Sequence, residues 1–322
     1  IAANPYWMKW VKDQLACRFK IVDLGAIKWF LGMRVVHDRE NGTLSVVQGA
    51  FARAIVEKYG AHEADKSKAP TPRNHNVVLS KQQSPQTQKD REYMKRIPYG
   101  SLKGALGYLA ICTRPDLAQA VSELGKFQAD PGVTHNSELR RVLKYVAATS
   151  NYGLVYRKDA GFDLQVYADA NWAEDIDNRR STSGYLFKRA GAPVSWRCKQ
   201  QSSTAQSTME SEVMALAECA SEALWMLQLA DEMGFEVRLP LPLFEDNQAC
   251  ITFAEGTKFH SRAKHIGYKY YFVKERVEDG TFKVEYCPTD KMLADVLTKP
   301  LPPVQFAKLR DAMGIVAVTL QE

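Results

Sequence analysis

The sequence has few cysteines, and they form no recognisable pattern. Six cysteines are scattered over 322 residues, with no C-x-x-C pair. This spacing argues against a structural zinc site and against a dense disulfide framework, and it fits a reducing compartment. The six histidines include no H-E-x-x-H motif. His260 and His265 are five residues apart, which is poor spacing for two metal ligands on one helix face.

Long apolar runs and targeting signals are also lacking. No stretch reaches the ~20 consecutive apolar residues that a membrane span needs, so no membrane partner is expected. The N-terminus has no basic segment followed by an apolar one, so no signal peptide and no secretion are expected. Because the first residue is Ile1 rather than Met, we interpret the chain as a fragment or a processed product.

The chain does contain enough apolar sequence to fold, and its charge is unevenly distributed. A length of 322 residues, with 45% apolar and 25% charged residues, is typical of two or three folded domains. Residues 73–158 carry 14 Lys and Arg against 6 Asp and Glu, whereas residues 159–322 carry 18 against 24. A basic middle beside an acidic end indicates polyanion binding next to a carboxylate site. The plainer alternative is a chance scatter of solvated charges.

The first half of the chain combines a hairpin with helices. The expected elements are a helix, two strands and a helix, at residues 6–20, 27–36, 44–48 and 51–59. The polar, proline-containing residues 61–92 are interpreted as a linker or a loose loop. Residues 98–149 have a helical pattern throughout. Arg140, Arg141 and Lys144 lie on the polar side of the last helix, where they either grip phosphates or form an ordinary solvated surface.

The hydrophobic period changes after residue 152. The expected strands lie at 154–156, 164–168, 184–189, 194–196, 241–245 and 282–286. The expected helices lie at 207–233, 247–255, 262–278, 290–298 and 303–313. From Leu164 onward the order is three strands, a helix, a strand, helices, a strand and a helix. This order predicts a mixed α/β sheet layered with helices.

Four acidic residues lie where this topology gathers them. Asp169 ends the first strand of the sheet and Asp246 ends the fourth, and ligands bind at such strand ends. Glu212 lies in the first turns of the long helix, and Asp295 lies on a late helix. Crowded carboxylates repel one another, so they are kept where hard cations such as Mg²⁺ neutralise them. Asp246 taken alone reads as a helix N-cap, but four acids in this order indicate a two-metal site.

Several motifs together carry a specific resemblance. They are YADANW at 167–172, RRSTSGY at 179–185, VSW at 194–196, STMESEVMAL at 207–216, EDNQ at 245–248, KHI at 264–266 and LADVLTKPL at 293–301. On these motifs, residues 162–301 resemble the ribonuclease H domain of copia-type retrotransposon Pol polyproteins. Upstream, DLG and FLG resemble the end of the same family's reverse transcriptase, at residues 23–25 and 30–32. YLA and TRPD resemble its helical segment between polymerase and ribonuclease H, at residues 108–110 and 113–116.

The resemblance implies an architecture for the whole chain. Residues 159–322 would form a ribonuclease H-like domain with a C-terminal helix, built on a mixed five-stranded sheet flanked by helices. Residues 1–72 would be the truncated palm end of the reverse transcriptase, and residues 73–158 a linker plus a helical thumb or connection segment. The Y-x-D-D hairpin that supplies polymerase metal ligands does not occur, so no polymerisation is expected from this chain alone. The apolar surface that packs against the rest of the palm is expected to be exposed.

The resemblance also assigns roles to the four acids. It implies that Asp169, Glu212, Asp246 and Asp295 are the catalytic and metal-binding residues, holding two Mg²⁺ ions with Mn²⁺ as a substitute. Glu210 competes with Glu212, which is preferred because it has the E-x-x-A-L spacing typical of ribonuclease H helices. The implied reaction is hydrolysis of the RNA strand of an RNA–DNA hybrid, which leaves a 5′-phosphate and a 3′-hydroxyl.

Contacts, partners and location follow from the same resemblance. The candidate nucleic-acid-binding residues are Ser207, Thr208, Asn247, Gln248, Lys264, His265, Arg140, Arg141 and Lys144. Lys264 and His265 belong to a segment, 258–276, in which basic residues alternate with aromatics, although the aromatics are more plainly interpreted as helix core. The implied partners are the RNA–DNA hybrid and the missing polymerase part or other Pol products. The implied location is the cytoplasm, within virus-like particles, with some nuclear presence.

Two departures from the family and two alternative functions stay open. The loop at 287–291 lacks the His that many ribonucleases H carry, and Asn171 stands where many relatives have a second Asp. The first alternative to an active nuclease is a catalytically silent nucleic-acid-binding remnant or a domesticated scaffold. A host ribonuclease H unrelated to transposons is disfavoured by residues 1–150.

Overall fold

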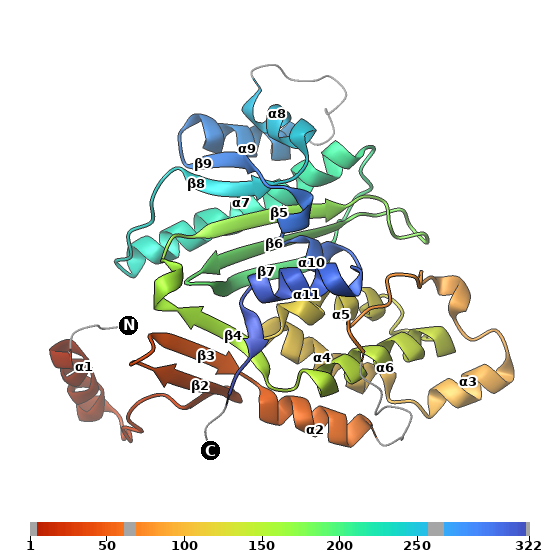
Figure 1. Cartoon of the computed structure of the whole chain (residues 1–322), viewed down its shortest axis with the longest axis horizontal. Coiled ribbons are helices and arrows are strands. Elements are labelled where there is room, and N and C mark those ends of the chain that lie inside the picture. Colours follow the sequence, from red (N-terminus) through yellow and green to blue (C-terminus); the bar gives the residue numbers. More distant parts are fainter. Residues whose placement is uncertain (1–4, 61–68, 257–266, 320–322) are drawn as a thin grey trace.

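Two five-stranded sheets organise the computed structural model, which describes residues 5–60, 69–256 and 267–319 (Figure 1). The first sheet has the strand order β1-β2-β3-β4-β10 and the second has the order β7-β6-β5-β8-β9. The strand β4 of the first sheet lies beside β7 of the second (Figure 1). The mixed sheet was expected, whereas the joining of the N-terminal hairpin with β4 and β10 in a sheet of its own was not.

The first sheet is antiparallel and is built from both ends of the chain. Its strands are β1 (Trp29–Phe30), β2 (Met33–Asp38), β3 (Thr43–Val47), β4 (Tyr152–Arg157) and β10 (Ile315–Ala317). The helix α1 (Pro5–Arg18) precedes β1 along the chain, and α2 (Gly49–Tyr59) follows β3. The single strand expected at 27–36 is wrong, because Leu31 and Gly32 have positive φ angles of 48° and 77°. These two residues form a tight hairpin turn, so Phe30 pairs with Met33.

A helical layer follows α2 along the chain and packs on it. It contains the short 3-10 helices η2 (Lys81–Gln83) and η3 (Pro115–Leu117), and the helices α3 (Gln88–Lys95), α4 (Tyr99–Cys112), α5 (Ala118–Gly125) and α6 (Val133–Ala148). The linker or loose loop expected at 61–92 is wrong for residues 69–92, because η2 and the start of α3 lie in it and the residues before them are packed against other helices. Arg73 is buried there and its guanidinium donates to Glu123 at 2.8 Å and to Glu138 at 2.6 Å. The two ion pairs of Arg73 fix this segment against α5 and α6.

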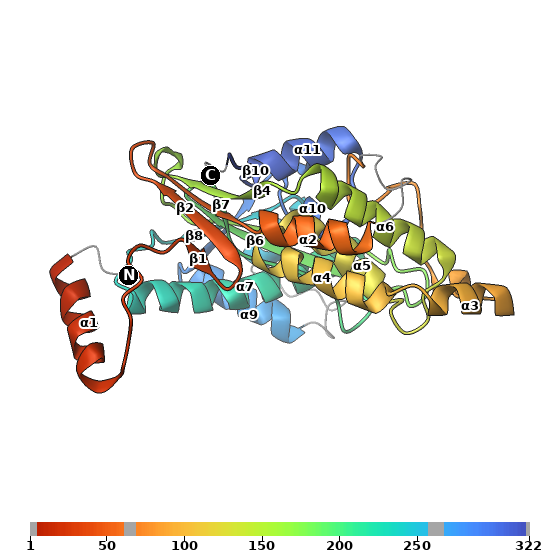
Figure 2. The same ribbon diagram turned by 90° about the horizontal axis from the view of Figure 1, so that it is seen from below.

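The second sheet confirms the predicted ribonuclease H-like mixed five-stranded sheet. Its strands are β5 (Gln165–Asn171), β6 (Thr182–Arg189), β7 (Ala192–Gln200), β8 (Leu241–Glu245) and β9 (Phe282–Tyr286). The first three are antiparallel neighbours, whereas β5, β8 and β9 run parallel. The helices α7 (Thr208–Glu232), α8 (Gln248–Glu255) and α9 (Gly267–Glu278) form one helical layer. Figure 2 shows α7 and α9 on the opposite side of the molecule from α10 and α11.

The last segment of the chain returns to the first sheet. After β9 come η6 (Thr289–Lys291), α10 (Asp295–Thr298) and α11 (Pro303–Ala312), so the single helix expected at 290–298 is two short ones. Then β10 pairs with β4, with Ile315 opposite Leu154. The C-terminal strand therefore completes a sheet that begins in the first 50 residues, and the domain boundaries 72/73 and 158/159 stay a prediction.

Two apolar features of the fold bear on the sequence expectations. Within the described ranges, α7 is the one helix long and apolar enough to cross a membrane by length and composition. Half of its apolar window is buried inside the protein, where it packs on β5 and β6, as expected of a core helix. At the N-terminus, large apolar side chains are exposed, including Trp7, Phe19 and Trp29 at 54%, 62% and 58%.

Candidate metal centre

The parallel strands β5 and β8 bring two of the predicted acids together. Asp169 lies near the end of β5, and Asp246 directly follows the last residue of β8. Because the two strands are parallel neighbours, their carboxyl ends meet at one edge of the sheet. The hydroxyl of Thr289 donates to Asp246 Oδ2 at 2.8 Å. Both aspartates are therefore positioned by the sheet and not by a loop of their own.

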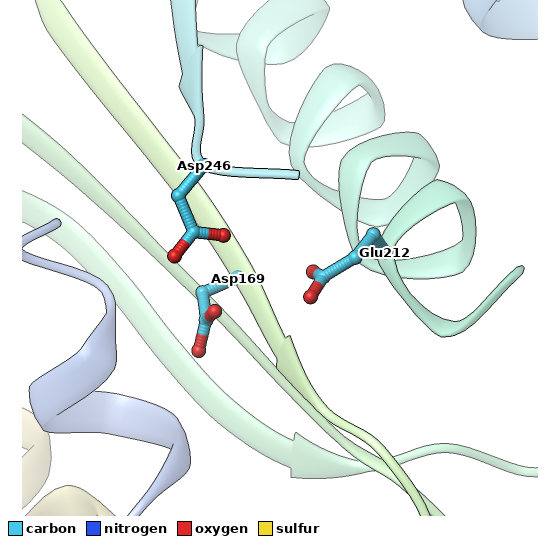
Figure 3. A group of neighbouring side chains, drawn as sticks. All are labelled: Asp169, Glu212 and Asp246. Carbon is cyan, nitrogen blue, oxygen red and sulfur yellow. The ribbon is translucent and has the colours of Figure 1, made fainter. Parts of the chain in front are cut away.

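The long helix supplies the third carboxylate. Ser207 caps the N-terminus of α7, where its hydroxyl accepts from the backbone N–H of Glu210 at 3.2 Å. The helix then carries Glu212 over the strand ends, and Figure 3 shows its carboxylate directed toward Asp169 and Asp246. Ligand oxygens from these three residues all lie within 4.8 Å of one another. The structure thus gathers three of the four predicted acids into one group.

Glu210, the competing glutamate, has a different position. Its carboxylate accepts from the backbone N–H of Gln206 at 2.8 Å, so it serves the helix N-terminus. Two residues apart on a helix point in different directions, and only Glu212 belongs to the three-carboxylate group. The geometry therefore favours Glu212 for a metal-binding role.

The fourth acid, Asp295, is linked to this group through a lysine. Asp295 opens α10, and Lys299 follows one turn later. The ammonium of Lys299 lies 2.8 Å from Asp295 Oδ1 and 3.4 Å from Asp169 Oδ1. The hydroxyl of Thr298 also donates to Asp169 Oδ2. A fixed cation therefore stands between the fourth acid and the three-carboxylate group.

A glycine lets α10 approach the sheet this closely. Gly184 is the cross-strand partner of Asp169 on β6. A Cβ atom at this position would lie 2.7 Å from Thr298 Cγ2 and 2.9 Å from Leu297 Cβ, well inside van der Waals contact. The glycine of the RRSTSGY motif thus admits the short helix that carries Asp295 and Lys299.

Burial strongly raises the pKa values of the buried acids of this centre. Asp169 and Asp295 are 1% exposed and Glu212 is 3% exposed. Burial raises the pKa of Glu212 well above its usual range, and the nearby carboxylates of Glu245 and Asp169 raise it further. Burial likewise raises the pKa of Asp169. It raises the pKa of Asp295 to about 7, with repulsion from Asp169 adding to burial and the Lys299 ammonium opposing it.

The donor set fits a hard divalent cation. Glu212 Oε2 and Glu245 Oε2 are buried and have no hydrogen-bond partner among the described residues. A buried carboxylate oxygen without a partner is costly unless a cation or a proton neutralises it. Carboxylate oxygens are the ligands that Mg²⁺ and Ca²⁺ prefer. Asp169, Glu212 and Asp246 could therefore hold one such ion, whereas the space between Asp169 and Asp295 is occupied by the Lys299 ammonium.

Three residues of the centre were not assigned a role from the sequence. Glu245 follows Leu241 and Leu243 in the buried alternation of β8, and that alternation signals an inward carboxylate. Thr298 and Lys299 lie in the LADVLTKPL motif, and the four-residue spacing from Asp295 to Lys299 is that of a helical ion pair. Their contacts with Asp169 depend on how α10 packs, which the spacing does not reveal.

Of the four residues near the centre that were predicted to bind nucleic acid, two are helix N-caps and two are exposed. Ser207 caps α7, and Asn247 caps α8 by accepting from the Cys250 backbone N–H at 3.1 Å. The N-cap interpretation of Asp246 is therefore wrong, because its neighbour fills that role. Thr208 and Gln248 are exposed beside the caps. Their binding role stays a prediction.

The basic residues predicted to grip phosphates are engaged elsewhere or lie outside the described residues. On α6, Arg140 donates to the Tyr59 carbonyl at 3.4 Å, and Arg141 donates to the Thr71 hydroxyl at 3.1 Å. Lys144 is half-buried on the same helix. These contacts favour the structural interpretation of that helix face. Lys264 and His265 lie outside the described residues.

Sequence comparisons give the chain its relatives. No family model matches it. It is 33% identical over 307 residues to the retrovirus-related Pol polyprotein from transposon TNT 1-94 of Nicotiana tabacum, which covers 95% of this chain and 23% of that protein. The polyprotein from transposon RE2 of Arabidopsis thaliana is 36% identical over 220 residues, 68% of this chain and 15% of that one. The secreted RxLR effector protein 161 of Plasmopara viticola is 50% identical over 133 residues, 41% of this chain and 94% of that protein.

Among solved structures, ribonuclease H1 from the archaeon Halobacterium salinarum NRC-1 is similar with 16% identity and a TM-score of 0.31, covering 42% of this chain and 94% of that one. The chain spans about a fifth of the length of the transposon polyproteins that it matches. Two of these matches extend over 95% of the chain and so include both sheets and the helical layer of α3–α6. The chain belongs to the family of copia-type retrotransposon Pol polyproteins.

Proposed function

We propose that this chain is a metal-dependent nuclease that hydrolyses the RNA strand of RNA–DNA hybrids. The observation that carries the proposal is the convergence of Asp169, Glu212 and Asp246, whose oxygens lie within 4.8 Å of one another. They come from three separate elements, and two of them are buried. Such a group is unfavourable in the absence of a cation, so its presence indicates a site for one.

Each acid of the centre would have its own role in the hydrolysis. A bound divalent cation would supply positive charge for phosphate oxygens and a water of lowered pKa. Asp169 and Asp246 would be its most direct ligands, and Glu212 would hold it from the helix and contact the substrate near the 2′-hydroxyl. Asp295, whose pKa is raised to about 7, would orient the attacking water and take up its proton near neutral pH. Lys299 would keep Asp295 in place.

Hybrid specificity and partners belong to the same proposal. A protein distinguishes RNA from DNA by the 2′-hydroxyl and by groove shape, while phosphate contacts supply most of the affinity. The exposed apolar residues between Tyr6 and Leu31 fit a surface that the polymerase part of Pol covers. Mg²⁺ as the ion, with Mn²⁺ as a substitute, and a location in cytoplasmic particles are part of this proposal.

The test is cleavage of a labelled RNA–DNA hybrid in Mg²⁺ by the chain and by Asp246→Asn. We expect cleavage of the RNA strand alone, and a loss of at least about a hundredfold in the variant, because the ion loses a charged ligand. Asp231→Asn, an exposed aspartate near the far end of α7, is the matched control and should cleave normally. Equal cleavage by both variants would sink the proposal.

A catalytically silent, nucleic-acid-binding remnant is the second candidate, and the Lys299 ammonium favours it. An internal cation beside Asp169 already compensates part of the acidic charge, so the fold does not depend on two metal ions. Folded protein that binds the hybrid but leaves it intact over a range of Mg²⁺ and Mn²⁺ concentrations would establish this alternative.

A further inference from the structure

An open groove lies between the two sheets, at the end of the molecule away from the acids. Its volume is about 790 Å³, and it is lined by parts of the β2–β3 hairpin, the end of β4 and the β6–β7 turn. Four permanently charged cations line it: Arg39, Arg157, Lys158 and Arg189. No aspartate or glutamate is among its lining residues. Three separate segments therefore direct positive charge into one groove.

These cations have no acidic partners within the part of the chain that the structure describes. Every ion pair found there involves other residues, and Arg39, Arg157 and Lys158 are exposed. Elsewhere the protein pairs its arginines readily, as Arg73 does with Glu123 and Glu138. Uncompensated like charges raise the local potential and attract a polyanion.

The backbone around the groove holds these charges at fixed spacing. The Arg157 N–H donates to the Ala190 carbonyl at 2.7 Å, which joins β4 to the β6–β7 turn. The Lys158 N–H donates to the Gly42 carbonyl at 2.9 Å, which joins β4 to the β2–β3 hairpin. The Tyr156 hydroxyl donates to the Pro193 carbonyl at 2.6 Å. The groove is thus built into the junction between the two sheets.

Exposed aromatic rings lie among the cations. Phe162 is 58% exposed and Phe235 is 46% exposed, and both line the groove. The Arg189 guanidinium lies 5.3 Å from the centre of the Phe235 ring. Cations that follow a backbone, together with aromatic faces on which bases stack, are the features of single-strand binding sites. A duplex hides the faces of its bases, so free aromatic faces favour an unpaired strand.

We propose that this groove binds a short single-stranded stretch of nucleic acid, with its phosphates on Arg39, Arg157 and Lys158 and its bases on Phe162 and Phe235. The site goes beyond the proposed nuclease centre and is distinct from it. Arg189 is five residues along β6 from Gly184, the cross-strand partner of Asp169, which is roughly 16 Å at the rise of a strand. A strand held there would be an unpaired extension or a displaced strand, not the hybrid at the acids.

The test is fluorescence anisotropy of labelled twelve-nucleotide oligo(U) and oligo(dT) with the full chain in EDTA, so that cleavage plays no part. We expect Arg157→Glu/Lys158→Glu to raise Kd at least tenfold for the tighter of the two probes. The slope of log K against log salt should fall by about 1.4, because each lost phosphate contact removes about 0.7 for a single strand. The tighter probe identifies RNA or DNA as the occupant.

The matched control is Lys89→Glu/Arg91→Glu, which makes the same charge change on exposed residues of α3, at the far side of the molecule (Figure 1). It should raise Kd less than threefold. Phe162→Ala/Phe235→Ala should raise Kd at least about thirtyfold with an unchanged salt slope, because two stacking contacts are lost and each contributes about 1–3 kcal/mol. These two rings are exposed, so this variant decides the matter if the charge reversal lowers Tm.

Two results would overturn the proposal. One is an equal loss of affinity in the groove and α3 charge reversals, which would mean that only net charge matters. The other is full affinity in Phe162→Ala/Phe235→Ala together with equal competition by a duplex of the same length. A loss confined to the groove variants, with weak duplex competition, would support it even if the chain cleaves nothing.

Discussion

The ammonium of Lys299 forms an ion pair with Asp295 at 2.8 Å, one helical turn away, inside the acidic centre. The lysine side chain is 29% exposed, whereas the Asp295 side chain is 1% exposed. Because Asp169 also lies 3.4 Å from this ammonium, one lysine neutralises charge on two buried aspartates. The fold thus carries its own cation, beside the three carboxylates that could hold a divalent one.

Replacing Lys299 tests whether this cation stabilises the metal-free fold. We expect Lys299→Met to lower the free energy of unfolding in EDTA by about 1–3 kcal/mol, because two buried carboxylates lose their counter-charge. Mg²⁺ should restore more stability to the variant than to the unaltered chain, because an ion can then fill the vacated position. Thermal unfolding with and without Mg²⁺ measures both effects.

Lys308→Met is the control for that experiment. Lys308 pairs with Asp290 at 2.8 Å, but both side chains are more than half exposed and screened by solvent, so the loss of stability should be much smaller than in Lys299→Met. Equal losses in the two variants, or no extra rescue of Lys299→Met by Mg²⁺, would contradict a special role for Lys299.

The decline of stability with rising pH should occur only without the metal. Burial raises the pKa of Asp295 to about 7 and raises the pKa values of Glu212 and Asp169. Between about pH 4 and pH 7 the folded chain therefore binds protons that the unfolded chain has lost. In EDTA, stability should be greatest at the low end of this window and fall as pH rises through it.

Divalent metal should remove this loss, because the ion binds the deprotonated carboxylates of the folded chain. Urea midpoints at pH 5, 6, 7 and 8, in EDTA and in Mg²⁺, measure the effect. Asp295→Asn should flatten the decline near pH 7. Asp290→Asn, at an exposed aspartate whose pKa is lowered, should not. Stability that rises with pH in EDTA would show that the acids are not protonated in the fold.

Replacing each of the two glutamates of α7 should affect a different property: metal affinity for Glu212 and stability for Glu210. Glu212→Gln should weaken Mg²⁺ binding at least tenfold in calorimetry, because one of the three converging carboxylates is lost. Glu210→Gln should leave metal binding unchanged and cost about 1 kcal/mol of stability, because it weakens the charged contact to the Gln206 N–H. The reverse pattern would move the metal-binding role to Glu210.

The sequence predicts the part of the centre that depends on local pattern. Asp169 and Asp246 follow recognisable strands, and Glu212 follows a helix start marked by Ser207, so their order and spacing suffice to bring them together. The sequence also predicts the second sheet, because its strands are short apolar runs bounded by turn residues or by segments with a helical period. The resemblance of the motifs extends these local signals to the family.

Long-range packing accounts for what the sequence does not predict. Arg73 lies in a polar, proline-containing stretch, and its partners Glu123 and Glu138 are 50 and 65 residues away, so nothing local signals a buried charge. Lys299 pairs with Asp295 at helical spacing, but its contact with Asp169 spans 130 residues and depends on the close approach of α10 to β6. The groove at the sheet junction combines residues from five segments that are distant in the sequence.

The close approach of α10 rests on Gly184, and replacing this glycine tests it. A Cβ atom there would meet Thr298 Cγ2 at 2.7 Å and Leu297 Cβ at 2.9 Å. Gly184→Ala should therefore push α10 outward and cost about 1–3 kcal/mol by overpacking. Because α10 carries Asp295 and Lys299, the change should also reduce the decline of stability with pH in EDTA.

Gly104→Ala is the matched control for this substitution. Gly104 lies inside α4, and a Cβ atom there meets nothing within 4 Å. Alanine should stabilise that helix by about 0.5–1 kcal/mol and leave the pH dependence unchanged. Urea unfolding at pH 5 and pH 8 measures both quantities for both variants. If Gly184→Ala is as well tolerated as Gly104→Ala, then α10 does not pack on β6 as described, and the position of Asp295 beside Asp169 loses its support.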